Sequence, residues 1–139
     1  MLLRLALIAL ILCLPIAARP DEASGVVQSV DKGDTFNVDG FGKVHLADVS
    51  CPDTTVYPGV QAKEFALENL VGVRVFLDID NGTGRDPEGI TNCMVYLCSP
   101  EGTPDLNRNF NVMMVESGHG TVSRDPRSEF NLSAMLAQG

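Results

Sequence analysis

Two short segments of the 139-residue chain concentrate side chains that can take part in acid–base or metal chemistry, residues 30–35 and residues 44–53. Carboxylates can hold a hard cation such as Ca²⁺ or activate a water molecule. An imidazole can exchange a proton near neutral pH. Each carboxylate also has a plainer interpretation, because Asp beside Gly or Pro is common in turns and loops. The candidate residues are Asp34, His45, Asp48, Ser50 and Asp53.

The two segments resemble the active-site core of the staphylococcal nuclease (thermonuclease) family. In that family the first motif reads D-G-D-T and the second roughly V-R-L-x-x-[VI]-D-[TA]-P-E. The positions that fit are Asp34, Thr35, Leu46 and Pro52. Residues 110–118 look like the family's V-N-x-x-L-V-x-x-G helix, and the likeness runs over residues 25–124. The resemblance implies a β-barrel with helices and a nuclease site that uses Ca²⁺.

The resemblance also implies a role for each candidate residue. Asp34 stands at the first metal-binding aspartate, and Ser50 replaces the second with a hydroxyl that is a weaker Ca²⁺ ligand. Asp48 is two residues before Ser50, so in an extended strand it can supply the missing charge, but we expect it to face solvent. Asp53 stands at the general base and is one methylene shorter than the family's glutamate; a displacement of about 1 Å can cost on the order of 10²-fold in rate. His45 stands at an arginine and cannot form its bidentate contact with phosphate.

Other positions remove more of the nuclease chemistry. Lys32 replaces an acidic residue, which predicts a site at Asp34 that is neutralised by an internal ion pair instead of a metal ion. Ile90 stands where the family has its second arginine, and Glu88 and Arg124 stand where it has tyrosines that stack on the nucleotide. These replacements together predict a nuclease-like fold with very weak or absent nuclease activity.

The charge of the chain disfavours nucleic acid as a partner. The chain has 18 acidic and 10 basic residues, which gives a formal net charge of −8. Clustered Lys and Arg supply most of the affinity for nucleic acids by neutralising phosphates, and this sequence has no basic run. An unidentified protein or small molecule is therefore the expected ligand.

Residues 1–18 have the pattern of a secretory signal peptide, with Arg4 before an apolar run and small residues at its end. The apolar run is shorter than the roughly 20 residues of a membrane-spanning helix. An uncleaved anchor is the alternative, because no clean small-x-small cleavage site follows. Residues 19–24 form a polar linker, and residues 25–139 form the domain. We expect a secreted or extracytoplasmic protein of the cell envelope, with membrane contact only through an uncleaved N-terminal segment.

Three cysteines lie after the signal, Cys51, Cys93 and Cys98, an odd number for an oxidising compartment. One disulfide with one free or intermolecular thiol is the simplest arrangement. Cys93 and Cys98 are five residues apart on an expected strand and point to opposite faces. We therefore expect a bond from Cys51 to one of them. No C-x-x-C pair or suitably spaced histidine favours a zinc site.

The hydrophobic pattern predicts a mainly β fold with helices, of the α+β class. The expected strands are 25–31, 35–38, 43–49, 73–78 and 93–98; the expected helices are 61–71, 109–117 and 128–136; brief pairing is expected at 121–122. Five short strands with a helix after the third favour a small Greek-key barrel of the OB type.

Three classes of function follow from these expectations. The first is a catalytically inactive binding module on a nuclease-like barrel, since function belongs to sites and not to folds. The second is a divergent Ca²⁺-dependent phosphodiesterase that cleaves DNA or RNA with Asp34, Asp53 and Asp48. The third is an envelope-associated structural protein whose unpaired thiol links it to a partner. The replaced site residues favour the first class.

Overall fold

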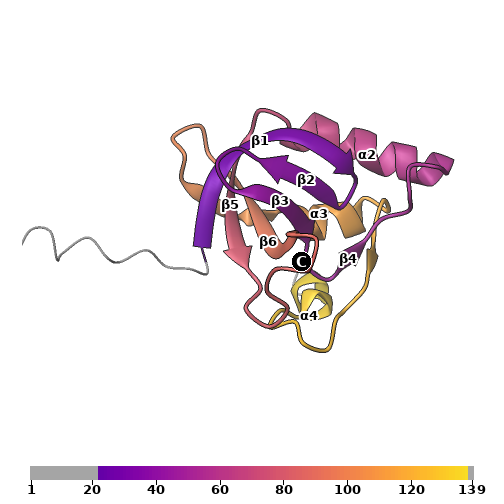
Figure 1. Cartoon of the computed structure of the whole chain (residues 1–139). Coiled ribbons are helices and arrows are strands. Elements are labelled where there is room, and N and C mark those ends of the chain that lie inside the picture. Colours follow the sequence, from indigo (N-terminus) through magenta and orange to yellow (C-terminus); the bar gives the residue numbers. More distant parts are fainter. Residues whose placement is uncertain (1–21, 138–139) are drawn as a thin grey trace, which may run out of the picture.

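A computed structural model describes residues 22–137 of the chain, so the expected signal peptide and the first half of the expected linker, residues 19–21, lie outside the described residues. The second half, residues 22–24, belongs to the first strand and is not a linker. The described part forms a closed, five-stranded mixed β-barrel (Figure 1). Neighbouring strands pair antiparallel in the order β3-β2-β1-β5-β6, and a parallel pairing of β3 with β6 closes the barrel. The barrel strands are β1 (Glu22–Lys32), β2 (Thr35–Val38), β3 (Gly42–Leu46), β5 (Arg74–Ile79) and β6 (Thr91–Cys98).

Three helices and three further strands complete the described fold. Helix α2 packs against β1 and lies along the upper side of the barrel in Figure 1, whereas α4 lies near its lower end. Strand β7 extends the sheet beyond β6, and β4 pairs with β8 in a separate two-stranded sheet. No helix between residues 22 and 137 has the length and apolar character to cross a membrane. These elements are β4 (Val49–Ser50), α2 (Tyr57–Leu70), β7 (Pro104–Asn109), α3 (Phe110–Glu116), β8 (Thr121–Val122) and α4 (Leu132–Ala137).

The predicted fold class is confirmed: the chain is a mainly β, OB-type barrel with helices. Several boundaries differ, among them the start of the first strand, at Glu22 and not residue 25, and of the last helix, at Leu132 and not residue 128. Two further differences have a clear physical reason. Helix α2 begins at Tyr57, four residues earlier than predicted, because Pro58 sits in its first turn, where a missing N–H costs nothing. The strand predicted over 43–49 is interrupted, because Asp48 has a φ of 62° and turns the chain between β3 and β4. Strand β7 was not predicted.

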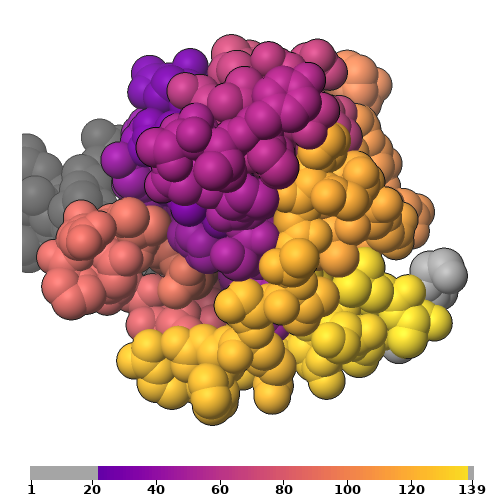
Figure 2. Space-filling view, turned by 90° about the vertical axis from the view of Figure 1, so that its right-hand side faces the viewer, coloured from indigo at the N-terminus to yellow at the C-terminus, as the bar shows by residue number. Residues whose placement is uncertain are grey.

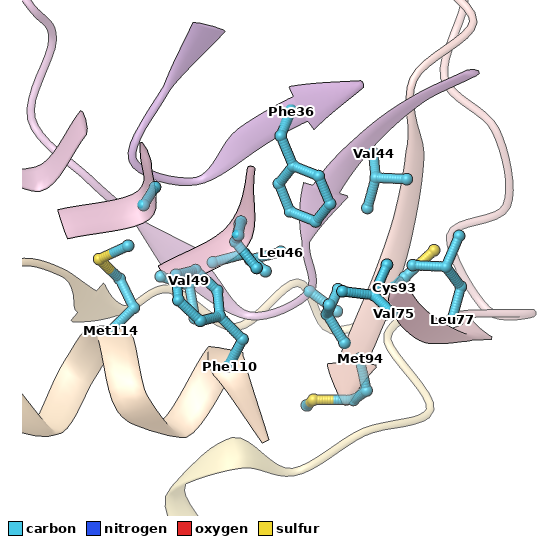
Figure 3. Close-up of a cluster of buried hydrophobic side chains, with 14 of the residues drawn as sticks. Phe36, Val44, Leu46, Val49, Val75, Leu77, Cys93, Met94, Phe110 and Met114 are labelled. Atoms are coloured by element: carbon cyan, nitrogen blue, oxygen red, sulfur yellow. The ribbon is translucent and has the colours of Figure 1, made fainter. Parts of the chain in front are cut away.

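The barrel interior is filled by alternate residues of the strands and closed by helix α3. Figure 3 shows Phe36, Leu46 and Phe110 in this cluster, and each is fully buried. On the side of the barrel that faces α2, Gly33 in the β1–β2 turn packs closely against Ala62 of that helix. A Cβ added to Gly33 would lie 2.7 Å from the Cβ of Ala62. The turn that carries Asp34 is therefore packed directly onto α2.

A single buried amide side chain joins the elements where the barrel closes. Strand β6 pairs with β3 through residue 93 and with β7 from residue 96 onward. The side chain of Asn111, from α3, bonds to the backbone of β6 between these two pairings. Its Oδ1 accepts from the backbone N of Val95 at 2.9 Å. Its Nδ2 donates to the backbone O of Ala47 at 2.9 Å and to that of Cys93 at 3.1 Å.

We expect Asn111→Ala to lower the free energy of unfolding by about 3 kcal/mol, because it leaves buried backbone groups without partners. Urea denaturation followed by circular dichroism measures the difference. Asn107→Ala, at an exposed position of β7, is the matched control and should change stability by less than about 0.5 kcal/mol. Equal losses in the two variants would contradict the role assigned to Asn111.

Candidate functional site

Asp34 is the centre of the predicted site, and it is buried in the turn between β1 and β2. Only 1% of the residue is exposed. Its Oδ1 accepts from the Thr35 hydroxyl at 2.8 Å, and its Oδ2 accepts from the backbone N of Cys51 at 2.7 Å. Both carboxylate oxygens are therefore already hydrogen-bonded within the protein.

Two basic side chains also face the Asp34 carboxylate. The Nζ of Lys32 lies 3.7 Å from Oδ1, which is the ion pair expected from the sequence. The Nε2 of His45 lies 3.6 Å from Oδ2. Each carboxylate oxygen of Asp34 thus faces a basic side chain of the same protein within 4 Å.

A chain of hydrogen bonds orients the His45 ring. Thr83 Oγ1 donates its hydrogen to Asp80 Oδ2 at 2.8 Å, so Thr83 Oγ1 acts as the acceptor for Asn92 Nδ2 at 3.1 Å. Asn92 Oδ1 consequently faces His45 Nδ1, 3.0 Å away, and accepts a hydrogen bond from it. With Nδ1 protonated, Nε2 has a hydrogen for Asp34 only in the imidazolium form.

These surroundings determine the ionisation of Asp34. Burial of the carboxyl group disfavours the charge, but the His45 ring, the backbone N of Cys51 and the Thr35 hydroxyl favour it. The net result is a pKa of Asp34 below its ordinary value. The folded structure therefore stabilises the carboxylate form.

Among the described residues, Ser50 and Asp53 are not side-chain partners of the Asp34 carboxylate. Ser50 is exposed on β4. Asp53 is exposed, and its Oδ1 accepts from the backbone N of Thr55 at 3.0 Å, which lowers the pKa of the Asp53 carboxyl group. This Asp53 contact is a turn before α2, the plainer of the two interpretations for this residue.

The expectation that Asp48 faces solvent is wrong. Only 6% of Asp48 is exposed, because its positive φ turns the chain and removes the strand geometry that would have placed it on the face of Ser50. Within residues 22–137, no three His, Cys, Asp or Glu side chains are grouped so that they could hold a metal ion. The donor set of Asp34, Ser50 and Asp48 therefore does not fit the Ca²⁺ that the family resemblance implies.

A polar pocket of about 460 Å³ lies next to His45. It is lined by the segment after β5, which carries Asp80 and Thr83, and by the loop after β8, residues 123–128. Figure 2 shows this loop (gold) along the lower edge of the molecule, next to the segment after β5 (salmon). This pocket was not predicted from the sequence.

Asp80 holds the two walls of the pocket together. Its Oδ1 accepts from the backbone N of Gly82 and, across the pocket, from that of Glu129, both at 3.0 Å. Burial raises the pKa of the Asp80 carboxyl group, but these bonds and those of Thr83 and Ser128 outweigh it and lower the pKa. The D-x-G-T pattern at residues 80–83, typical of a side-chain-bonded turn, is the sequence signal that indicates this role.

The three cysteines are buried free thiols in the structure, so the disulfide expected from Cys51 is not formed in it. Burial raises the pKa of Cys51 and of Cys93 to about 12, with nearby carboxylates adding to the effect. Burial also raises the pKa of Cys98. Thiols of this kind are poor nucleophiles at neutral pH.

Fold and site together describe an OB-type barrel with a buried, internally paired aspartate beside a polar pocket. No protein-family model matches the chain, and no curated protein matches it. The chain is therefore classified by its fold, as an OB-type barrel with helices.

We expect Asp34→Asn to lower the free energy of unfolding by about 2 kcal/mol near pH 7, because hydrogen bonds and ion pairs to a charged group are lost. The folded pKa lies below the ordinary value of 3.8. The contribution of Asp34 is therefore complete above that pH and is lost as the pH falls through the folded pKa. Denaturation from pH 7 to pH 3 should show the two stabilities converging at the acid end.

The control for this comparison is Asp39→Asn, in the exposed β2–β3 turn. Its free energy of unfolding should equal that of the wild-type protein at every pH. A constant gap between wild type and Asp34→Asn over the whole range would contradict the assigned ionisation of Asp34.

Proposed function

We propose that the chain is an exported binding module, built on a barrel that resembles the staphylococcal nucleases but does not cleave nucleic acid. Its ligand is a small molecule or a protein, and the polar pocket beside His45 is the binding site. The expected signal peptide supports export. The single observation that carries the proposal is the occupation of Asp34 by partners from its own chain.

A metal-dependent nuclease needs a carboxylate that is free to bind the metal ion. Asp34 instead accepts two hydrogen bonds and faces Lys32 and His45 within 4 Å. To bind Ca²⁺ it would have to release these partners, with no second carboxylate from Ser50 to compensate. The arrangement thus stabilises the fold at the position where a nuclease would keep an open ligand.

The remaining groups support the same conclusion. A general base must reach the attacking water, whereas the Asp53 carboxylate is engaged with the backbone N of Thr55. At the position of the first arginine, His45 directs one ring nitrogen to Asp34 and the other to Asn92. The net charge of −8 opposes the approach of a polyanion.

The two other classes of function are less well supported. A divergent Ca²⁺-dependent phosphodiesterase needs Asp34, Asp48 and Asp53 to act together, and the first and last of these are engaged in separate contacts. A thiol-linked envelope protein needs a reactive cysteine. Cys51, Cys93 and Cys98 are all buried with raised pKa values.

Cleavage of single-stranded DNA and RNA by the purified protein, with Ca²⁺ or with chelator, tests the proposal. We expect no cutting in either condition from protein that circular dichroism shows to be folded. Asp34→Ala and Asp39→Ala are assayed in parallel as a matched pair. Calcium-dependent cutting that Asp34→Ala abolishes and Asp39→Ala retains would overturn the proposal and favour the phosphodiesterase.

A further inference from the structure

Asp48 is the one described residue whose buried side-chain atoms have no hydrogen-bond partner. It lines the polar pocket, and both of its carboxylate oxygens are buried. No ion pair to Asp48 is formed by residues 22–137 either. Either protonation state leaves hydrogen-bonding capacity unmet, and the ionised state also lacks a counter-charge, so the residue is costly to the unliganded fold.

The backbone conformation of Asp48 is a second indication of a binding site. Its φ of 62° is the only positive value among the described residues other than glycine. The conformation is held from both sides, because Asn111 Nδ2 donates to the O of Ala47 and the backbone N of Ser123 donates to the O of Asp48 at 2.8 Å. Strained residues kept in place by their surroundings occur preferentially at binding and catalytic sites.

The other two carboxylates of the pocket differ from Asp48, because each has partners. Asp80 accepts hydrogen bonds from two backbone N–H groups and from Thr83. Asp125 pairs with Arg127, whose Nη2 lies 2.7 Å from its Oδ2. Asp48 is therefore the carboxylate of the pocket whose hydrogen-bonding capacity the described residues leave unmet.

We propose that the pocket binds a small organic cation through an ammonium group that donates hydrogen bonds to Asp48. The proposal rests on the binding function proposed above and specifies the chemical class of its ligand. A charge-assisted N–H···O bond would satisfy both the hydrogen-bonding capacity and the charge of Asp48. A metal ion fits less well, because no three suitable donor groups meet at this place in the described residues.

The remaining lining suits the body of such a ligand. Asn92 and Ser123 offer polar groups at the wall of the pocket. Arg124 and Arg127 also line the pocket and are exposed. Side-chain rotamer changes are common on binding, and the proposal requires one that opens the buried Asp48 carboxylate to the ligand. The volume of about 460 Å³ is within the range of small-molecule sites.

Titration of the ¹⁵N-labelled protein with butylammonium, observed by NMR, tests the inference. We expect saturable shifts of the backbone amides of Asp48 and Ser123 within tens of millimolar. Asp48→Asn keeps the size of the side chain and tolerates the positive φ, and it should weaken binding by at least about tenfold. Asp39→Asn is the matched control and should bind as the wild type does.

Two further probes test separately whether binding requires the positive charge and the N–H donors of butylammonium. Butanol lacks the charge, tetramethylammonium lacks the N–H donors, and neither should produce the saturable shifts. The inference is overturned if butylammonium causes no saturable shift at the pocket, or if Asp48→Asn binds it equally well. Such a result leaves the proposed binding function standing, since that function fails only if the cleavage assay detects nuclease activity.

Discussion

The Asn111 side chain is the contact on which the rest of the structure depends. A five-stranded barrel of this kind closes through one short parallel pairing, here between β3 and β6, and strand β6 must then leave β3 to pair with β7. Backbone groups in such an interval would be buried without partners. Asn111 supplies a donor and an acceptor for Ala47, Cys93 and Val95, so that the same residue both closes the barrel and anchors α3 to it.

The polar groups of the site follow from this closure. Asn111 holds the turn in which Asp48 lies buried, and the pairing of β3 with β6 places His45 opposite Asn92. His45 Nε2 faces the Asp34 carboxylate at 3.6 Å. On its other side, hydrogen bonds run from His45 through Asn92 and Thr83 to Asp80. The Asp34 carboxylate is satisfied by partners within the chain, whereas both oxygens of Asp48 are buried without a hydrogen-bond partner. Asp34 thus stabilises the fold, and Asp48 is the residue for which we propose a ligand.

Much of the barrel could be predicted from the sequence, because alternating apolar residues and glycine turns define strands locally. The Asp39–Gly40 hairpin and the ion pair of Lys32 with Asp34 are examples in which neighbouring residues decide the outcome. Asp48 could not be predicted, since its burial depends on a positive φ that Asn111 and Ser123 hold from distant parts of the chain. For the same reason the pocket was missed: its walls, at residues 80–83 and 123–128, are far apart in the sequence and are joined by tertiary contacts, among them the hydrogen bond from the backbone N of Glu129 to Asp80. Strand β7 has little apolar alternation, and its pairing with β6 is a tertiary effect.

The central claim is that partners within the chain, and not a metal ion, satisfy Asp34. The most direct test is a Ca²⁺ titration of the ¹⁵N-labelled protein that follows the backbone amide of Cys51, which donates to Asp34 Oδ2. Our account predicts no saturable shift of this signal as Ca²⁺ rises through the millimolar range, where weak extracellular calcium sites are filled. A saturable shift that Asp34→Asn abolishes and Asp39→Asn retains would contradict it.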